Sequence, residues 1–229
     1  MSSLSKSSVV LFDLDGTLID TAPDLGAAAN HVRERAGLPP LPLVDYRPFA
    51  SAGARGLLGH AMGITPEHAD FPAQRDLFLA YYRDNIAKQS SLFDGVGQLL
   101  EALRAQGKRW GVVTNKPSWL TMPLLAEFSD LHDSVCSVSA DQVAKAKPAP
   151  DSLLHACTLI GAEPADCIYV GDDLRDIDAG RAAGMRTVAA AWGYIGATPL
   201  AQWNADDVVQ TPAELAQLCA RTAHTPSQH

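Results

Sequence analysis

Two aspartates stand two residues apart directly after a short apolar run, Val9–Phe12, which is typical of a buried strand. Because residues i and i+2 of an extended strand point the same way, Asp13 and Asp15 can face one site before Gly16 lets the chain turn. Two carboxylates so close repel each other unless a cation or a shared proton lies between them, and Mg²⁺ favours such oxygen ligands. One carboxylate could attack phosphorus while the other exchanges protons; a helix-capping aspartate turn is the alternative.

A second polar group, Thr114-Asn115-Lys116, follows the apolar stretch WGVV. A hydroxyl group and successive backbone N–H groups at a strand-to-helix turn suit a phosphoryl group, so Thr114 and Asn115 are candidate phosphate ligands. Lys116 is a candidate substrate contact at the same turn. An ordinary turn before Pro117 would give the same pattern.

Lys147 stands before Pro148 and is the candidate cation for the phosphate. A lysine there can act as a point charge on a phosphoryl group, and it can keep a neighbouring carboxylate ionised. A solvated basic loop is the alternative for Lys147, and we expect Lys145 to be exposed at the surface.

The segment Gly171–Asp176, with the sequence GDDLRD, follows the buried strand CIYV. Acidic groups at such a position are costly unless they meet a metal ion or basic side chains. We expect Asp172 to be a metal ligand, and Asp173 and Asp176 to support the site, one of them paired with Lys147. N-caps for a helix over 177–183 are the alternative, and both can coexist.

The elements that must position these groups alternate between strand and helix after residue 95. Such βα units predict an α/β fold with a parallel sheet and helices on both faces, and ligands bind beyond the carboxyl ends of its strands. The expected strands are 9–15, 110–114, 135–139, 167–170, 187–191 and 208–209. The expected helices are 97–106, 149–160, 177–183 and 212–219.

Between the first strand and this alternating part the pattern is helical. Thr21 and Asp24 could form a capping box on the first helix, and further helices are expected over 54–62 and 72–89. Arg55 could bind a substrate carboxylate through its two-pronged guanidinium, although a surface arginine would fit the sequence equally well. We therefore assign residues 1–19 and 91–229 to a core domain and residues 20–90 to a helical cap.

The chain has 229 residues with 18 basic and 26 acidic side chains, and its formal net charge is −8. It contains no basic cluster, so binding to nucleic acid is not expected. Cys136, Cys157, Cys167 and Cys219 match no zinc or redox motif and predict reduced thiols in a cytoplasmic protein. The polar N-terminus, Met1–Ser8, precedes an apolar run too short for a signal peptide or a membrane span.

The motifs resemble, in order, those of the haloacid dehalogenase-like phosphatase superfamily. They are DxDGTLxD at 13–20, TNK at 114–116, KP at 147–148 and GDDxxD at 171–176, and the similarity runs from about Val9 to Ile195. The resemblance implies a Rossmann-like doubly wound core with an α-helical cap inserted after the first motif. It also implies a Mg²⁺-dependent phosphate monoester hydrolase that forms an aspartyl-phosphate intermediate.

The resemblance further implies roles for individual residues. Asp13 would be the nucleophile and Asp15 the general acid and base. Asp13, the backbone carbonyl of Asp15, and Asp172 would hold Mg²⁺, while Thr114 and Lys147 would bind the transferring phosphoryl group.

Within the superfamily the chain resembles the bacterial phosphoglycolate phosphatases, through DTAPDL at 20–25, TNKP at 114–117 and GDDLRDIDAGRAAGM at 171–185. It is also similar to phosphatases of N-acetylmuramic acid 6-phosphate in cell-wall recycling, through SAGAR at 51–55, WGVVTNKP at 110–117 and WGYI at 192–195. Both substrates carry a carboxylate, so Arg55 does not separate them. The expected partner is a small phosphorylated metabolite, bound by a monomer or a homodimer.

Three other classes are less consistent with the sequence. A dehalogenase on this fold needs no metal and would not be expected to keep Asp15. A sugar phosphomutase differs only in the fate of the phosphoenzyme, and the similarities above disfavour it. A non-enzymatic phospho-acceptor module would lack the helical insert, and Asp15 beside Asp13 predicts rapid turnover instead.

Overall fold

The computed structural model describes residues 9–221, so Met1–Ser8 and the last eight residues lie outside the described part of the chain. Its main sheet has six parallel strands in the order β5-β4-β1-β6-β7-β8. The strands, in that order, are Ser137–Ser139, Arg109–Thr114, Val9–Phe12, Cys167–Gly171, Arg186–Ala190 and Asp207–Val209. The expected doubly wound parallel sheet is therefore confirmed.

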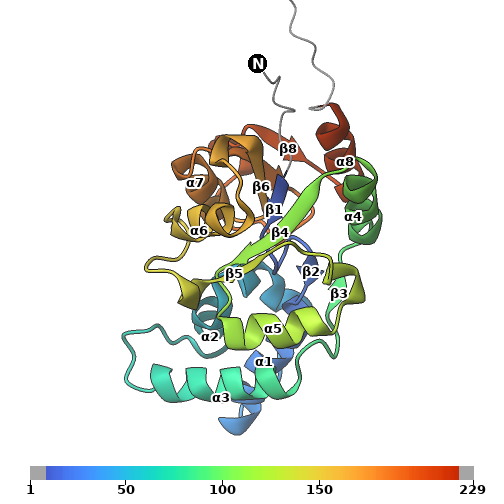
Figure 1. The fold of residues 1–229 in the computed structure, drawn as a ribbon. Coiled ribbons are helices and arrows are strands. Elements are labelled where there is room, and N and C mark those ends of the chain that lie inside the picture. The colour runs from blue at the N-terminus through green and yellow to red at the C-terminus, as the bar shows by residue number, and fades with distance from the viewer. Residues whose placement is uncertain (1–8, 222–229) are drawn as a thin grey trace, which may run out of the picture.

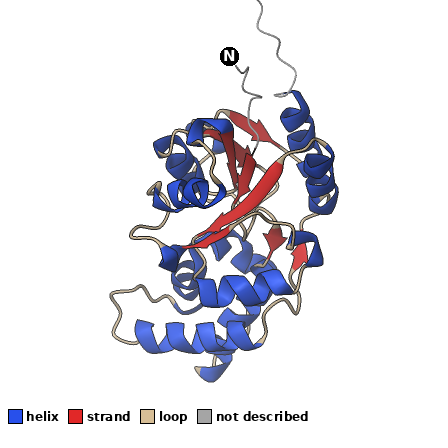
Figure 2. Ribbon diagram, viewed as in Figure 1, coloured by secondary structure: helices blue, strands red, loops and turns tan. Residues whose placement is uncertain are grey.

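The central strand β1 is buried on both faces, and its side chains alternate between two hydrophobic clusters. Val10 and Phe12 pack with α4 (Val96–Ala105) and α8 (Pro212–Arg221). Val9 and Leu11 pack with the opposite layer, which contains α6 (Asp151–Ile160) and α7 (Leu174–Ala182). Figure 2 shows helices on both sides of the sheet, as parallel sheets require.

A second hydrophobic cluster lies in what we call the helical module, residues 22–84. The module contains α1 (Ala22–Arg35), a 3₁₀ segment (Leu43–Ala52), α2 (Gly53–Met62) and α3 (Phe71–Asp84). Its cluster includes Leu57, Phe78 and Tyr82, together with Leu120 and Tyr194 from outside the module. Figure 1 places the module at the bottom of the view, below the sheet.

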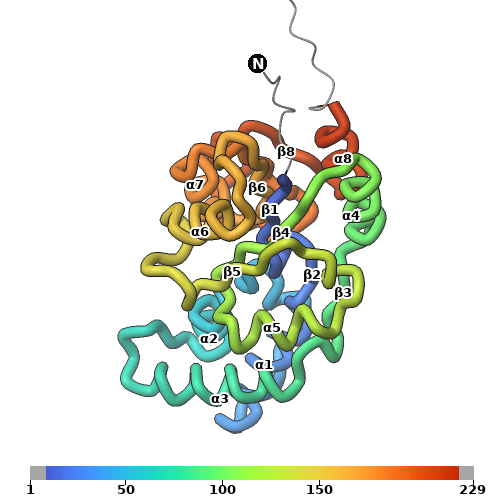
Figure 3. The backbone as a smooth tube through the Cα atoms, in the orientation of Figure 1, coloured from blue at the N-terminus to red at the C-terminus, as the bar shows by residue number. Residues whose placement is uncertain are grey.

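Two short strands, β2 (Ile19–Asp20) and β3 (Ser91–Leu92), connect the module to the sheet. They pair antiparallel, so the outgoing and returning chains run side by side (Figure 3). Asp24 holds the returning chain, because its buried carboxylate accepts hydrogen bonds from the Gln89 and Ser90 backbone N–H groups and from the Ser90 hydroxyl. We call β2 and β3, with the residues next to them, the linkers. They are held together by the backbone pairing of the two strands and by the hydrogen bonds of Asp24.

The prediction of a Thr21–Asp24 capping box is wrong. Thr21 makes no side-chain cap on α1, and its hydroxyl donates instead to Asp15 Oδ1 over 2.6 Å. Tyr194 supplies the missing acceptor, since its phenol oxygen accepts from the backbone N–H groups of Thr21 and Ala22 at 2.7 and 2.8 Å. The first helix of the module is therefore capped by a residue 172 or more positions away.

Several boundaries also differ from the sequence prediction. Helix α3 ends at Asp84 rather than at residue 89, because Asn85 turns out of the helix and its side chain bonds the Tyr81 carbonyl. Helix α7 starts at Leu174, three residues early, because Asp173 is its N-cap. The elements that sequence reasoning missed are β2, β3, the 3₁₀ segment and α5 (Ser118–Ala126). Helix α5 lacks helical periodicity, since its sequence is apolar almost throughout and contains Pro123.

No helix within residues 9–221 is long and apolar enough to cross a membrane. Cys136, Cys157, Cys167 and Cys219 are all free thiols, as the sequence predicted. Lys145 is exposed, again as expected.

We predict that Asp24→Ala destabilises the protein by about 1–3 kcal/mol, because it leaves the buried donors of Gln89 and Ser90 without their acceptor. Urea unfolding followed by circular dichroism measures the change. Asp84→Ala is the matched control, since Asp84 is exposed and pairs only with its neighbour Arg83. Equal midpoints for Asp24→Ala and the control would contradict the linker role of Asp24.

Candidate active site

The loop after β1 carries the first candidate group and is shaped by close contacts with the loop after β6. The Asp13 backbone N–H donates to the Val170 carbonyl, which continues the β1–β6 pairing by one residue. Gly16 then has φ +89°, and a Cβ there would lie 2.1 Å from Asp172 Oδ2. Only glycine fits this turn, and the fit brings Asp172 beside the Asp13 loop.

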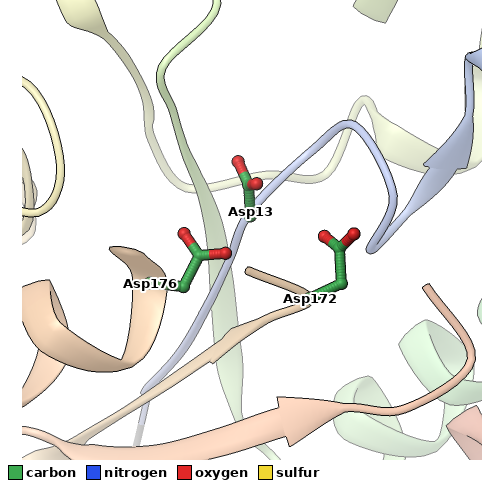
Figure 4. Close-up of side chains that lie close together, drawn as sticks. All are labelled: Asp13, Asp172 and Asp176. Carbon is green, nitrogen blue, oxygen red and sulfur yellow. The ribbon is translucent and has the colours of Figure 1, made fainter. Parts of the chain in front are cut away.

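Three carboxylates converge at this point. Oxygen atoms of Asp13, Asp172 and Asp176 lie within 4.8 Å of one another, and Figure 4 shows the three side chains around one space. Asp172 is held by the Thr17 hydroxyl at 2.8 Å and by the Tyr194 backbone N–H at 2.9 Å. The cluster brings together Asp13 and Asp172 as the sequence predicted, and it adds Asp176, which we had placed in a supporting role.

Burial makes this negative charge costly. Burial raises the pKa of Asp13 to about 7, although the nearby Lys147 ammonium opposes the shift. Burial, together with the charges of Asp13 and Asp176, also raises the pKa of Asp172 well above its ordinary value. Three carboxylates around one ammonium leave an excess of negative charge, so the donor set fits a hard divalent cation such as Mg²⁺.

Lys147 is the cation that the protein itself places in the cluster. Its Nζ lies 2.9 Å from Asp13 Oδ1 and 2.7 Å from Asp176 Oδ1, and it donates to the Tyr169 hydroxyl at 2.7 Å. Burial opposes the charge, but Asp13 and Asp176 outweigh it and raise the pKa of Lys147. The sequence predicted that either Asp173 or Asp176 would pair with Lys147, and the structure shows that Asp176 does so.

Asp15 lies apart from the acidic cluster, so its carboxylate is not among the three that could share a metal ion. Its Oδ1 accepts from the Thr21 hydroxyl at 2.6 Å and from Lys116 Nζ at 2.8 Å. Lys116 Nζ also lies 4.7 Å from the centre of the Tyr82 ring, a cation–π distance. The sequence assigned Lys116 to the substrate, whereas the structure pairs its ammonium with Asp15.

The turn after β4 also carries Thr114 and Asn115, the other two residues of the Thr114-Asn115-Lys116 motif, and their side chains make different contacts. The buried Thr114 hydroxyl accepts from the Lys116 backbone N–H at 3.1 Å, and a hydroxyl can still donate one hydrogen bond. Asn115 has both side-chain groups occupied, because it exchanges 2.9 Å hydrogen bonds with the backbone N–H and carbonyl of Lys147. Asn115 thus positions the Lys147 loop, and its amide, which lines the pocket, has a second N–H beyond this bond.

Helix α7 begins with a reciprocal cap. Asp173 accepts from the Arg175 backbone N–H at 2.9 Å, while Asp176 Oδ2 accepts from the Asp173 N–H at 3.1 Å. The Arg175 guanidinium forks onto both Asp173 oxygens and lowers the pKa of Asp173 against the effect of burial. The helix-cap interpretation of this motif is therefore confirmed, and the same Asp176 also belongs to the acidic cluster.

A pocket of about 410 Å³ lies between these loops and the helical module. From the sheet side it is lined by Asp13, Asp15, Thr114, Asn115, Lys116, Lys147, Asp173, Arg175 and Asp176. The module contributes Leu25, Phe78, Leu79, Tyr82 and residues 50–55, which include Arg55. Every candidate site residue therefore lines one pocket except Asp172, which is buried beneath it.

Sequence reasoning missed four side chains of this site. The Thr17 hydroxyl donates to Asp172, and the Tyr169 hydroxyl accepts from Lys147. Tyr194 joins the Asp172 loop to α1, and Arg175 binds Asp173. Thr17, Tyr194 and Arg175 stand within motifs that were noticed, but no spacing rule pairs Thr17 with Asp172 or Tyr194 with Thr21 across more than a hundred residues.

Comparison with known proteins agrees with this site. The model of the haloacid dehalogenase-like hydrolases matches residues 10–190, which span all four motifs. An N-acetylmuramic acid 6-phosphate phosphatase from Pseudomonas aeruginosa is 40% identical over 217 residues, covering 94% of this chain and 96% of the relative. A phosphoglycolate phosphatase from Xanthomonas campestris is 42% identical over 210 residues, covering 90% and 93%.

Solved structures give the same result. A crystal structure described as a predicted phosphoglycolate phosphatase from Haemophilus somnus superposes with a TM-score of 0.82 at 29% identity, covering 93% of this chain and 98% of the other. CbbY from Rhodobacter sphaeroides, solved with phosphate, superposes at 0.72 with 21% identity and coverages of 91% and 96%, and supports the fold alone. With the family model, the relatives and the geometry in agreement, this chain belongs to the haloacid dehalogenase-like hydrolases.

Proposed function

We propose that this protein is a Mg²⁺-dependent phosphatase that hydrolyses the phosphate monoester of a small metabolite. The observation that carries the proposal is the meeting of Asp13, Asp176 and Lys147 in the lining of one pocket, with the buried Asp172 beside Asp13 and with Asp15 also in the lining. This arrangement offers a nucleophile, a cation site and a separate proton carrier. The resemblances of the sequence and the names of its relatives support the same class of reaction.

In the first step an Asp13 oxygen attacks phosphorus, and the bond between phosphorus and the substrate oxygen breaks. Asp15 gives its proton to the departing oxygen, so the alcohol leaves neutral. In the second step water attacks the aspartyl-phosphate, Asp15 takes the proton, and phosphate leaves with the Asp13 carboxylate restored. Bound Mg²⁺, held by Asp13 and Asp172, would supply positive charge that stabilises the phosphoryl oxygens.

The chain's own groups prepare these steps. Lys147 neutralises Asp13 and can also face a phosphoryl oxygen, while Thr114 has a hydroxyl hydrogen to donate there. Phosphoryl transfer depends chiefly on positioning and on charge neutralisation, which suits this fixed set of charges. Asn115 contributes indirectly by holding the Lys147 backbone.

We propose phosphoglycolate, or an ester of similar type with a carboxylate, as the substrate. The N-terminus of α2 has no side-chain cap and lines the pocket, and the positive end of the helix dipole there favours an anion. Arg55 lies in the same turn and can bind a carboxylate through two hydrogen bonds. Both features place positive charge across the pocket from the phosphate position.

N-acetylmuramic acid 6-phosphate is the second candidate, and the size of the pocket favours it. A volume of about 410 Å³ is within the range that binds whole sugar-sized ligands. Part of the pocket lining is apolar, and a two-carbon ester would leave this part uncovered. It is formed by Leu25, Phe78, Leu79 and Leu120. The lactyl carboxylate of this sugar could reach Arg55 in the same way.

The remaining assignments complete this proposal. Residues 20–90 act as a cap that shields the reaction from bulk water, and residues 1–19 and 91–229 form the catalytic core. The protein works in the cytoplasm on a free metabolite, as a monomer or a homodimer, without nucleic acid or membrane.

We predict that Asp13→Asn lowers kcat by a factor on the order of a thousand or more, because the amide cannot attack phosphorus. Hydrolysis of p-nitrophenyl phosphate with Mg²⁺ measures the loss, and thermal unfolding checks that the nearly isosteric variant folds. Wild-type kcat in a folded variant would remove Asp13 as the nucleophile.

We predict that Asp172→Ala raises the Mg²⁺ concentration needed for half-maximal activity by more than about tenfold, since even outer partners of metal ligands have effects of that size. A Mg²⁺ titration at fixed p-nitrophenyl phosphate measures it. Asp178→Ala on the following helix, α7, is the control, since Asp178 belongs neither to the acidic cluster nor to the pocket lining. A titration curve that does not move would take Asp172 out of the ligand set.

We predict that Arg55→Ala raises KM for the preferred carboxylated ester by about tenfold, the effect of one charge-assisted pair. The experiment compares kcat/KM for 2-phosphoglycolate and N-acetylmuramic acid 6-phosphate, with Arg75→Ala, an exposed arginine of α3, as the matched control. The better substrate identifies the metabolite. If neither KM changes, Arg55 does not bind the substrate carboxylate.

A further inference from the structure

Arg175 connects the catalytic core to the helical module at a point away from the two linkers. It is the second residue of α7, and its Nη2 donates to the Ser51 backbone carbonyl over 2.7 Å. The side chain is only 32% exposed, so this bond lies partly shielded from water. The hydrogen bonds of the module with Tyr194, Asp20, Gln89 and Ser90 lie instead at the linkers next to β2 and β3.

The accepting carbonyl lies in the segment that carries the proposed substrate contact. Ser51 is near the end of the 3₁₀ segment, and the chain then turns at Gly53, with φ +57°, into α2. Residues 51–55 all line the pocket, and Arg55 is among them. No side chain caps the start of α2. The hydrogen bond from Arg175 to the Ser51 carbonyl, which we call the tether, connects this turn to the core.

Arg175 and Arg55 differ in how their charges are used. Arg175 is committed to the protein, since its Nε and Nη2 contact Asp173 Oδ1 and Oδ2 at 2.8 and 2.9 Å. Arg55 forms no hydrogen bond or salt bridge with any residue from 9 to 221 and is exposed to the pocket. The Arg175 guanidinium is therefore occupied by contacts within the protein, and the Arg55 guanidinium is available to bind an anion.

We propose that Arg175 is a positioning residue that holds the segment Ser51–Arg55 over the active site and so sets the affinity for the substrate's remote anionic group. The inference rests on the proposed function and extends it to a residue of the core. Asp173 orients the guanidinium in a two-pronged pair, and the third contact points to the module. Asp173 thus affects substrate binding indirectly, because it orients Arg175, and Arg175 in turn holds the Ser51 backbone.

Hydrogen exchange followed by mass spectrometry tests the tether without any substrate. We expect Arg175→Ala to speed exchange at the amides of residues 51–55, while peptides from the β-sheet keep wild-type rates. Arg186→Ala is the matched control, because Arg186 forms a similar pair with Asp207 at β7 and β8, away from the pocket. Unchanged exchange at residues 51–55 in Arg175→Ala would overturn the proposal.

A double-mutant cycle tests the consequence for binding. We expect Arg175→Ala to raise KM for the carboxylated ester about tenfold with a smaller change in kcat, and to cost less with p-nitrophenyl phosphate, which has no remote anion. If Arg175 works through Arg55, the double variant loses hardly more than Arg55→Ala alone. Additive losses, or equal losses on both substrates, would show that Arg175 acts independently of Arg55 and would overturn the proposal.

Two controls keep the results interpretable. Wild-type hydrolysis of p-nitrophenyl phosphate with Mg²⁺ tests the proposed phosphatase function by itself, so its failure is distinct from failure of the tether. If Arg175→Ala does not fold, Arg175→Lys replaces it in both experiments, since a single ammonium cannot keep the two-pronged Asp173 pair and the Ser51 bond together. Wild-type exchange and KM in that variant would equally overturn the proposal.

Discussion

The crowding of Asp13, Asp172 and Asp176 against one lysine is the constraint on which this structure depends. Buried carboxylates are tolerated only where cations or hydrogen bonds compensate them. Lys147 serves Asp13 and Asp176, and Asp172 receives hydrogen bonds from Thr17 and a backbone N–H. The remaining negative charge makes the cluster suitable for a divalent cation, and a phosphate could then be attracted by that cation together with Lys147.

The parallel sheet is what makes such crowding possible. Its strands all end at one edge, so loops that are more than a hundred residues apart in the chain meet there. The side chains of β1, β4 and β6 are buried on both faces, and the chain can expose charge only after each strand ends. Polar motifs placed directly after apolar runs are therefore brought together by the topology itself.

This relation explains how much the sequence could predict. Asp13, Thr114 and Asp172 stand at the ends of strands that the apolar pattern identifies, whereas Lys147 lies in a loop beyond β5. The position of Asp176 in the acidic cluster could not be predicted, because it depends on α7 starting three residues earlier than its apolar pattern indicates. The partners of Lys116 and Arg175 depend on how the helical module sits over the sheet, and no local pattern encodes that orientation.

The two aspartates that we propose as nucleophile and proton carrier are consequently held by different parts of the molecule. Asp13 pairs with Lys147, whose other partners, Tyr169 and Asp176, all belong to the sheet layer. Asp15 instead bonds Thr21 in the linker and Lys116, which lies against Tyr82 of α3. A shift of the helical module would therefore disturb the contacts of Asp15 and leave the pairing of Asp13 with Lys147 in place. Under the proposed mechanism the position of the module is thus linked to proton transfer, while the cation beside the nucleophile is held by the core.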